Sequence, residues 1–553
     1  MSKGDFESNL EAAGSFGKAQ WILVFMNLYI MGYSGWQTYI PVFSTRKVDF
    51  YCIDSRNNSK VNLVDLYSNL QTMKLSEVFE SNGSEFDQIC VDHCSQYVYK
   101  SKPDSIVSEF NLACGSDTFL VAFSNSIYFI ACFISCFVSG YLCDKYGRKN
   151  VAFFLIIIQC LSTTGIIFTH NIYLYIGLRF VAGFGTLTTS IDYIIFAESA
   201  DKKILSKMGL TIMISFVLGE FSCILCGYFI QGSWHLQFAV LAVPGYVYAV
   251  LHFFFMPESA RWLHSQKKYA RAEEVLKKIA KINNRDPLTI HLYDTDENLA
   301  NNFQNSETSS STQNLIEATS DESDSDVRLP TTPSLLDLFK TVPSALLTLS
   351  GALSWFSASL VYYGLTYDVQ NIGGDFYLNA ILLTFTEIPA WFVCLAMDKF
   401  GRLRTFYISL FICSIACAIL PFTAPLLNGN LQIAFAVLGK FLSTGAFDSL
   451  YVYTPEQLPT VLRTTGITFC SAAARIASIC APFIIEIKAG PYNSVPFIIF
   501  AVSGLITCIS VFLVGVETKD KPYITTIEEY QQLAHTKEVK QIQNKVEAPL
   551  SGA

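Results

Sequence analysis

Long apolar runs dominate this sequence and constrain its fold more than any other feature. Each run is close to the roughly 20 apolar residues that a helix needs to cross a bilayer. The runs are Trp21–Pro41, Thr118–Leu142, Val151–His170, Ile172–Ala197, Met208–Ile230, His235–Met256, Val342–Leu365, Tyr377–Met397, Thr405–Leu426, Leu431–Tyr453, Thr464–Ile487 and Ser494–Val516. A membrane-spanning strand needs only about ten alternating residues, so helices are expected. The sequence predicts an all-α membrane protein with about twelve spanning helices.

The composition excludes several other classes of protein. Hydrophobic residues make up 51% of the 553 residues and charged residues only 15%, whereas a soluble domain carries roughly 25% charged residues. The formal net charge of −8 gives no reason to expect nucleic-acid binding. The sequence has no P-loop and no Gly-x-Ser-x-Gly elbow, and its seven histidines show no metal-ligand spacing. We therefore expect neither an enzyme nor a bound metal or cofactor.

A polar stretch, Val42 to Asp117, separates the first two apolar runs. Four cysteines together with glycosylation sequons indicate an oxidising compartment, and hence a small extracellular loop domain with two disulfides. The sequence leaves open which of the three pairings the cysteines adopt, and a cytosolic loop with chance sequons is the weaker alternative. The cysteines are Cys52, Cys90, Cys94 and Cys114, and the sequons begin at Asn57 and Asn82.

Charges in the short loops predict the orientation. Basic residues gather in the loops Asp144–Lys149, Asp201–Lys207 and Asp398–Arg404, whereas the loops of opposite parity have almost none. Membrane proteins carry an excess of lysine and arginine on the cytoplasmic side. We therefore expect a multi-pass protein of the plasma membrane, with both termini in the cytoplasm and the cysteine-containing loop outside.

The domain boundaries follow from the apolar runs. We expect a cytoplasmic N-terminus over 1–20, an N-terminal six-helix bundle over 21–256 that includes the loop domain at 43–117, a cytoplasmic loop over 257–340, a C-terminal six-helix bundle over 341–516 and a cytoplasmic tail over 517–553. Within the cytoplasmic loop, residues 270–282 have the pattern of a basic amphipathic helix on the cytoplasmic face. The polar segment Asn301–Ser334 has the composition of a disordered linker.

Three landmarks occur in both halves of the chain. The loop Asp144-Lys-Tyr-Gly147-Arg148 recurs as Asp398-Lys-Phe-Gly401-Arg402, Glu198 recurs as Glu456, and Glu258-Ser259 recurs as Glu517-Thr518, each at nearly the same spacing. Such a repeat predicts two matched six-helix bundles, the architecture of a transporter that rocks about a central site. The glycines permit a tight turn, and an aspartate and an arginine four residues apart can pair as a reversible gate. The alternative is ordinary flanking charge that only sets the topology.

These motifs resemble those of a known family. Gly140-Tyr-Leu-Cys-Asp-Lys-Tyr-Gly-Arg-Lys149 resembles the signature loop of the major facilitator superfamily, and Pro257-Glu-Ser-Ala-Arg261-Trp-Leu is similar to a motif that follows the sixth helix in sugar transporters and in solute carrier family 22. The remaining motifs narrow the resemblance to family 22, the organic ion transporters: Glu109-Phe-Asn-Leu-Ala-Cys114, Tyr362-Tyr-Gly-Leu365, Asn371-Ile-Gly-Gly374 and Tyr453-Thr-Pro-Glu-Gln-Leu-Pro-Thr-Val-Leu-Arg463.

The resemblance covers about residues 20 to 530. It implies the twelve-helix major facilitator fold of two pseudo-symmetric bundles, and it adds Arg261 and Arg463 to the expected gating residues. The sequence departs from the family pattern at Ala260, where the motif has proline, and in having four loop cysteines where many members have six.

Charged residues inside the apolar runs are the candidates for substrate binding, because a charge in a span costs roughly 2.5–3.5 kcal/mol. The resemblance makes Glu387 the acidic cavity residue of the cation and carnitine members, and Trp391 stands where anion members carry a lysine. Trp355 and Tyr362 are seven residues apart, hence on one helix face, and match the family's cavity aromatics. They would attract an ammonium group through cation–π contact, and helix packing is the alternative role.

Three further charges complete the expected site. The resemblance makes Asp448 a cavity position with added negative charge, whereas Glu220 is either a third carboxylate or the partner of a basic neighbour. Arg475 matches an arginine of the anion and carnitine members, and it would hold a carboxylate through its bidentate fork. We expect unneutralised carboxylates at Glu387 and Asp448; the alternative is that Arg475 neutralises one of them. Two other charges in the runs are expected in structural pairs or hinge contacts, namely Arg179 and Lys440.

The sequence therefore predicts a polyspecific transporter of organic cations or carnitine-like zwitterions that works by alternating access. One alternative is an organic anion transporter that uses Arg475 and Lys440, and another is a non-transporting membrane receptor or scaffold. The expected partners are a small organic substrate, the lipid bilayer and, through the extracellular loop, further copies of the chain. The sequence does not decide whether sodium or a proton is co-transported.

Overall fold

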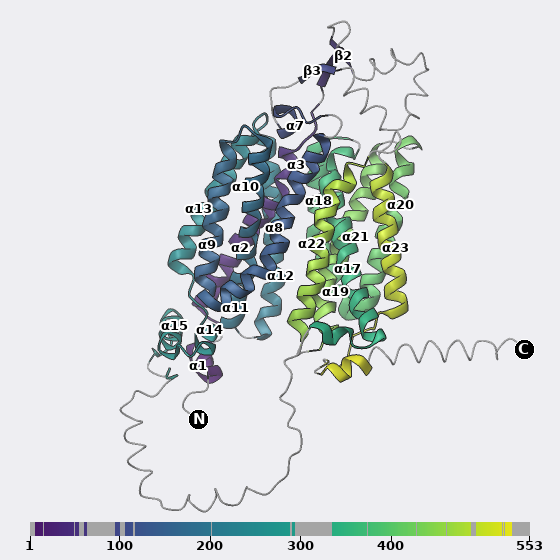
Figure 1. Cartoon of the computed structure of the whole chain (residues 1–553). Helices are drawn as coiled ribbons and strands as arrows, with labels where there is room; N and C mark the ends of the chain where they lie inside the picture. Colours follow the sequence, from purple (N-terminus) through teal and green to yellow (C-terminus); the bar gives the residue numbers. More distant parts are fainter. Residues whose placement is uncertain are drawn as a thin grey trace, which may run out of the picture.

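The computed structural model in Figure 1 consists mainly of long helices. It describes residues 6–14, 16–48, 50–54, 60–62, 94–99, 105–113, 117–200, 202–287, 290–292, 335–372, 374–426, 429–459, 462–487, 494–521, 524 and 526–532. The predicted linker, the sequons at Asn57 and Asn82, and the cysteines Cys90 and Cys114 lie outside these residues.

Helices form over the apolar runs, because a backbone shielded from water must satisfy its polar groups internally. The first half contains α1 (Phe6–Ala13), α2 (Lys18–Tyr39), α3 (Pro41–Ser44), β1 (Phe50–Asp54), β2 (Lys60–Asn62), β3 (Cys94–Tyr99), α7 (Ile106–Glu109), α8 (Asp117–Tyr146), α9 (Arg148–Ile167), α10 (Ile172–Phe184), η1 (Gly185–Leu187), α11 (Thr188–Ser199), α12 (Lys202–Phe229), α13 (Trp234–Phe255), α14 (Ala260–Ser265) and α15 (Tyr269–Ile282). The second half contains η3 (Leu335–Phe339), α17 (Val342–Tyr367), η4 (Asp368–Asn371), α18 (Phe376–Phe385), α19 (Glu387–Phe400), α20 (Arg402–Leu426), α21 (Gly429–Gln457), α22 (Arg463–Ile485) and α23 (Ser494–Val514).

The long helices lie in two groups, side by side (Figure 1). The first half supplies α2 and α8 to α13, and the second half supplies α17 to α23. The strands lie at one end of the molecule, which we call the sheet end, and α1, α14 and α15 lie at the other, which we call the terminal end. Helix α8 packs against α22, and α12 packs against α18, so these two pairs join the halves.

Ten helical segments of the described chain are long and apolar enough to cross a membrane. Helices α2 and α12 occupy the two remaining predicted runs, and α12 contains a shorter apolar stretch, Ile214–Phe229. Large apolar side chains such as Phe254 and Phe512 are 71% and 70% exposed on the outer surface, as expected of helices that face lipid. The prediction of a multi-span helical protein is confirmed.

A small antiparallel sheet, which the sequence analysis did not predict, forms within the polar stretch after the first spanning helix. Its strand order is β2-β1-β3, with a register shift between Ile53 and Asp54 where β1 pairs with β3. Two of the four loop cysteines lie on these paired strands: Cys52 is opposite Tyr97, and Cys94 is opposite Asp54.

The predicted amphipathic helix exists as α15, but its apolar face is covered by protein. Ala272 and Leu276 of α15 are fully buried, in a cluster that also contains Phe6 of α1 and Trp262 of α14. Asn283, which caps the C-terminus of α15, accepts a hydrogen bond from the backbone N–H of Ala19 at 2.8 Å. The amphipathic pattern of α15 therefore arises from its packing with α1 and α14 in a small helical unit at the terminal end.

Glycines allow a close helix crossing in the first half. Helix α2 packs along α12, and a Cβ atom on Gly219 of α12 would collide with the carbonyl oxygen of Gly32 of α2. One helical turn further along α2, a Cβ atom on Gly35 would collide with the carbonyl oxygen of Phe216. The backbones of α2 and α12 are therefore in direct contact at this crossing.

Candidate functional site

A buried ion pair lies at the centre of the second half. Lys440 of α21 places its Nζ 2.8 Å from Oε1 of Glu387, at the start of α19, and both side chains are almost completely buried. Tyr362 of α17 donates a hydrogen bond from its hydroxyl to Oε2 of Glu387 at 3.0 Å. The Lys440 ammonium also donates to Oγ1 of Thr366 at 2.5 Å and lies 3.3 Å from the centre of the Tyr362 ring. The expectation of an unneutralised carboxylate at Glu387 is therefore wrong, because Lys440 neutralises it.

A second carboxyl approaches this pair from the first half of the chain. Glu220 of α12 is 1% exposed, and its Oε2 has no hydrogen-bond partner among the described residues. Its carboxyl interacts directly with the Glu387 carboxyl and electrostatically with Lys440. Two buried acids thus share one base, which leaves one excess negative charge or one proton in the cluster.

Asp448 and Arg475 are two further charged residues of the expected site, and both lie on helices of the second half. Neither side chain has a hydrogen-bond or ion-pair partner within the part of the chain that the structure describes, and both are partly exposed. Asp448 lies on α21 and Arg475 on α22, and the Tyr451 hydroxyl interacts electrostatically with both. Arg475 therefore does not neutralise Glu387 or Asp448 in this structure, and two opposite charges remain available close to one aromatic side chain.

Aromatic rings connect the ion pair to these unpaired charges. Phe447 stacks on Tyr362, with 5.8 Å between ring centres, and meets Trp355 edge-on at the same distance. Tyr451 is 44% exposed and meets Trp355 edge-on at 4.7 Å. Trp355 itself is 1% exposed and donates from Nε1 to Oγ1 of Thr454 at 2.8 Å, so it packs in the core and supports Tyr451. Sequence reasoning missed Phe447 and Tyr451, one helical turn apart on α21.

The repeated loop motif of the first half forms a cluster at the terminal end. Arg148 pairs with Glu198, which also accepts a hydrogen bond from the Ser259 hydroxyl. The backbone N–H of Arg148 donates to Oε1 of Glu258 at 2.9 Å, so this carboxylate caps the N-terminus of α9. Gly147 turns the chain with φ +98°, and a Cβ atom there would lie 2.5 Å from Oε2 of Glu258.

The second half repeats this arrangement at α20. Arg402 pairs with Glu456 at 3.2 Å, and Glu456 accepts a hydrogen bond from the Thr518 hydroxyl at 2.7 Å. The backbone N–H of Arg402 donates to Oε1 of Glu517 at 2.7 Å. Gly401 has φ +104°, and a Cβ atom there would lie 2.5 Å from Oε2 of Glu517. The matched glutamates of the sequence repeat thus occupy matched positions in space.

Desolvation and hydrogen bonds act in opposite directions on Glu517, which lies beyond the end of α23. Partial burial raises the pKa of its carboxyl, but hydrogen bonds from the backbone N–H groups of Lys519 and of Arg402 to Arg404 outweigh that effect. The pKa of Glu517 therefore lies below its ordinary value, and the carboxylate stays ionised where it caps α20.

Other expected gating residues lie at the same end but make different contacts. The expected pair of Asp144 with Arg148 is absent, because Arg148 turns to Glu198 and the Asp144 side chain is exposed. In the second half Arg402 does reach Asp398, at 3.2 Å. Arg261 pairs with Glu7 of α1 at 2.8 Å. Arg463 is the first residue of α22.

Contacts between the halves gather near the sheet end. Lys47, after α3, pairs with Glu486, after α22, with 3.0 Å between Nζ and Oε2. The Tyr367 hydroxyl donates to the carbonyl oxygen of Thr38 at 2.9 Å, and the Tyr377 hydroxyl donates to that of Gly227 at 3.1 Å. The sequence gave no indication of this set, since each contact joins residues more than a hundred positions apart.

Two other charged side chains inside the first half are held by their own bundle. Asp192 accepts a hydrogen bond from the Tyr248 hydroxyl, and one of its oxygens lies 3.2 Å from Nε2 of His252. The Arg179 guanidinium lies 4.5 Å from the centre of the Tyr128 ring. Nε and Nη1 of Arg179 have no hydrogen-bond partner among the described residues, so its expected structural role stays a prediction.

Comparison with known proteins extends these observations. Residues 83–533 match the family described as "Sugar (and other) transporter". The chain is 29% identical over 477 residues to solute carrier family 22 member 2 of Rattus norvegicus, with 86% of this chain and 80% of that protein covered. It is also 29% identical over 436 residues to organic cation/carnitine transporter 2 of Homo sapiens, with coverages of 77% and 72%. The organic cation transporter-like protein of Drosophila melanogaster is 29% identical over 537 residues, with coverages of 93% and 90%.

Solved structures with the same fold include the xylose transporter XylE from E. coli in an inward-open conformation. The TM-score is 0.59 at 15% identity, over 93% of this chain and 99% of that one. At this identity the likeness concerns the fold alone. The family match, in contrast, covers most of the chain. The protein is therefore a transporter and not an enzyme: it belongs to the sugar (and other) transporter family of the major facilitator superfamily, and its relatives include organic cation and carnitine transporters of solute carrier family 22.

Proposed function

We propose that the protein carries small organic cations or carnitine-like zwitterions across the plasma membrane by alternating access. The observation that carries the proposal is the pair of unpartnered opposite charges, Asp448 and Arg475, that share Tyr451 as a neighbour. A charge without a partner inside a membrane protein is costly and usually functional. A zwitterion would satisfy both, with its ammonium at Asp448 and its carboxylate at Arg475.

The surrounding side chains support binding of the cationic group. Tyr451 is 44% exposed beside Asp448 and offers an aromatic face, which attracts a quaternary ammonium by roughly 0.5–2 kcal/mol. Arg475 offers a planar fork that a carboxylate accepts through two hydrogen bonds. The Glu387–Lys440 pair contacts Tyr362, which stacks on Phe447. Glu387 would therefore affect substrate binding by positioning these two rings, not by touching the substrate.

The contacts near the sheet end and the clusters at the terminal end are proposed to be the gates. Lys47 and Glu486 belong to different halves and must separate when the protein opens at the sheet end. The clusters around Glu198 and Glu456 each hold one bundle together at the opposite end. We place the sheet end outside the cell, because it carries the stretch with the predicted disulfides and sequons, and the terminal end, with its basic loops, in the cytoplasm.

The test is uptake into proteoliposomes that contain the purified full-length protein. Labelled carnitine, tetraethylammonium and an aromatic carboxylate are compared for the wild type, Asp448→Asn and Arg475→Gln. We expect Asp448→Asn to reduce uptake of carnitine and tetraethylammonium at least about tenfold, and Arg475→Gln to reduce only that of carnitine, since tenfold corresponds to the roughly 1.4 kcal/mol of one lost charge contact.

Matched controls are Glu274→Gln and Arg271→Gln, which remove exposed charges on α15, far from the site. Unchanged carnitine and tetraethylammonium uptake in both site variants contradicts the proposal. Uptake of the aromatic carboxylate alone, lost in Arg475→Gln, identifies an anion transporter instead. Lys440 gives little support to that alternative, because Glu387 already neutralises it. The absence of counterflow with all three compounds would favour a receptor or scaffold.

A further inference from the structure

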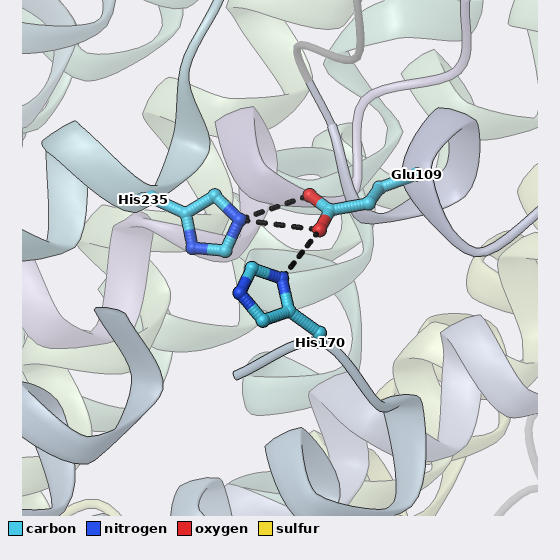
Figure 2. Close-up of side chains that lie close together, drawn as sticks. All are labelled: Glu109, His170 and His235. Atoms are coloured by element: carbon cyan, nitrogen blue, oxygen red, sulfur yellow. Dashed lines mark hydrogen bonds and ion pairs between the residues drawn. The ribbon is translucent and has the colours of Figure 1, made fainter. Parts of the chain in front are cut away.

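We propose that Glu109, His170 and His235 form a Zn²⁺ site at the sheet end of the first half. The three residues come from separate segments: Glu109 ends α7, His170 precedes α10, and His235 is the second residue of α13. Figure 2 shows both imidazole rings directed at the Glu109 carboxylate. One ligand atom from each residue lies within 4.8 Å of the other two.

The hydrogen bonds of His235 determine which ring nitrogen carries the proton and which one directs its lone pair at the Glu109 carboxylate. Nδ1 lies 2.9 Å from the carbonyl oxygen of Ile167. A carbonyl oxygen only accepts, so Nδ1 carries the proton in the neutral ring. Nε2 then directs its lone pair at the Glu109 oxygens, 3.0 and 3.3 Å away. Two electron-rich atoms at this distance need a cation between them or a second proton on the ring.

The distances fit a tetrahedral metal ion. Zn²⁺ binds histidine nitrogen and carboxylate oxygen at about 2.0–2.2 Å, which places neighbouring ligand atoms of a tetrahedron roughly 3.3–3.6 Å apart. The Glu109 oxygens lie 3.0 and 3.3 Å from Nε2 of His235, and 3.5 Å separates Oε1 from Nδ1 of His170. The ligand nitrogens of His170 and His235 lie within 4.8 Å of each other, so the exposed His170 side chain would move inward to complete the site, with water in the fourth position.

The neighbours of the ligands also resemble those of a metal site. Metal-binding histidines usually donate their second N–H to a carbonyl or carboxylate, as His235 does toward Ile167. The Trp234 indole donates to Oε2 of Glu109 at 2.6 Å and so orients the carboxylate. The His170 side chain is 82% exposed, which gives an ion in solution direct access. Carboxylate and imidazole ligands of this kind suit Zn²⁺ better than Mg²⁺ or Ca²⁺.

An ion at this place would add a metal link between three segments, two of which already meet through the Trp234–Glu109 hydrogen bond and the contact of Phe110 with Trp234. Helix α7 lies between the small sheet and α8 (Figure 1), His170 lies in the connection between α9 and α10, and His235 lies in the first turn of α13. Bound Zn²⁺ would fix the base of the polar stretch onto the first half. It would therefore stabilise the protein and restrain its motion at this end, independently of which substrate is carried.

The test measures Zn²⁺ binding to the purified full-length protein in detergent, after chelator treatment and alkylation of accessible cysteines. Isothermal titration and thermal unfolding are recorded with ZnCl₂, and with MgCl₂ and CaCl₂ for comparison. We expect Zn²⁺ alone to raise the melting temperature, because it binds only the folded site. His170→Ala should weaken Zn²⁺ binding at least about tenfold, and His170→Glu, which restores a ligand, should bind more tightly than His170→Ala.

His264→Ala is the control, since this histidine lies on α14 at the terminal end, and it should bind Zn²⁺ like the wild type. His170 is exposed, so its variants are expected to fold; a matching melting temperature without metal verifies this. Equal Zn²⁺ affinity of the wild type and His170→Ala, or no binding by either, overturns the proposal and leaves a protonated His235 paired with Glu109.

Discussion

Lys440 forms a buried ion pair with Glu387, at 2.8 Å, in contact with a second acid that comes from the other half of the chain. Lys440 is therefore the one basic side chain that two buried carboxyls share in the described structure. Removing one partner of a buried pair typically costs 3–5 kcal/mol, because the other charge is left without compensation.

We predict that Lys440→Met destabilises the protein more than Glu387→Gln. Without Lys440, Glu220 and Glu387 face each other with no positive charge between them; without the Glu387 charge, Lys440 still has Glu220 beside it. We expect a loss of about 3–5 kcal/mol for Lys440→Met and less for Glu387→Gln. Thermal unfolding of the purified variants measures both, and Lys440→Met/Glu387→Gln should recover part of the loss. A larger effect of Glu387→Gln would contradict this order.

Gly147 and Gly401 should not tolerate a side chain. Both have positive φ, and an added Cβ would lie 2.5 Å from the glutamate that caps the next helix. Alanine at either position should therefore cost about 1–3 kcal/mol and reduce transport. Gly140→Ala is the matched control, because nothing lies within 4 Å of a Cβ there and the residue is inside α8. Equal melting temperatures for all three variants would refute the argument.

The cap at Glu517 makes a pH-dependent contribution to stability. Its pKa is lowered from the ordinary value of 4.5 in the folded protein, so its contribution is complete above that value and is lost as the pH falls through the lower, folded pKa. Glu517→Gln should lower the melting temperature by a constant amount from about pH 8 to about pH 5, and by less under more acidic conditions. A difference that grows on acidification would have the wrong sign.

The pair of Lys47 with Glu486 should respond to exchange of its charges. Lys47→Glu or Glu486→Lys places like charges at the contact between the halves, which should disfavour closure at the sheet end and slow uptake severalfold. The double variant restores opposite charges and should recover most of the rate. Uptake at low and high ionic strength checks this, since the Lys47 side chain is 36% exposed and salt screens such pairs. Equal rates in all variants would exclude a gating role.

The sequence was sufficient to predict the spanning helices and the repeat, because both depend on local composition and on spacing along the chain. The matched clusters at Glu258 and Glu517 follow from the recurring Glu-Ser and Glu-Thr pairs. The amphipathic pattern correctly predicted the helix α15. The pattern alone cannot distinguish an apolar face that is covered by lipid from one that is covered by protein.

The partners of individual charges could not be predicted. Lys440 and Glu387 lie more than fifty residues apart, and only the packing of α19 against α21 brings them together. Asp448 lies on the same helix as Lys440 and interacts with it electrostatically, but it forms no hydrogen bond or ion pair within the described residues. The histidines His170 and His235 gave no metal-ligand spacing, because segments far apart in the sequence bring them to Glu109. Such relationships are tertiary and leave no periodic signal in the chain.

The glycine crossing of α2 and α12 has a consequence for Glu220. Because Gly219 of α12 lies against the backbone of Gly32 of α2, we expect the two helices to move together, and Glu220, the next residue of α12, to move with them. In the proposed opening at the sheet end, Glu220 would therefore move away from Glu387 and Lys440. Electrostatic repulsion between the two acids would then be weak in the open form and strong in the closed form. A proton or cation bound between them would therefore stabilise the closed form more than the open form.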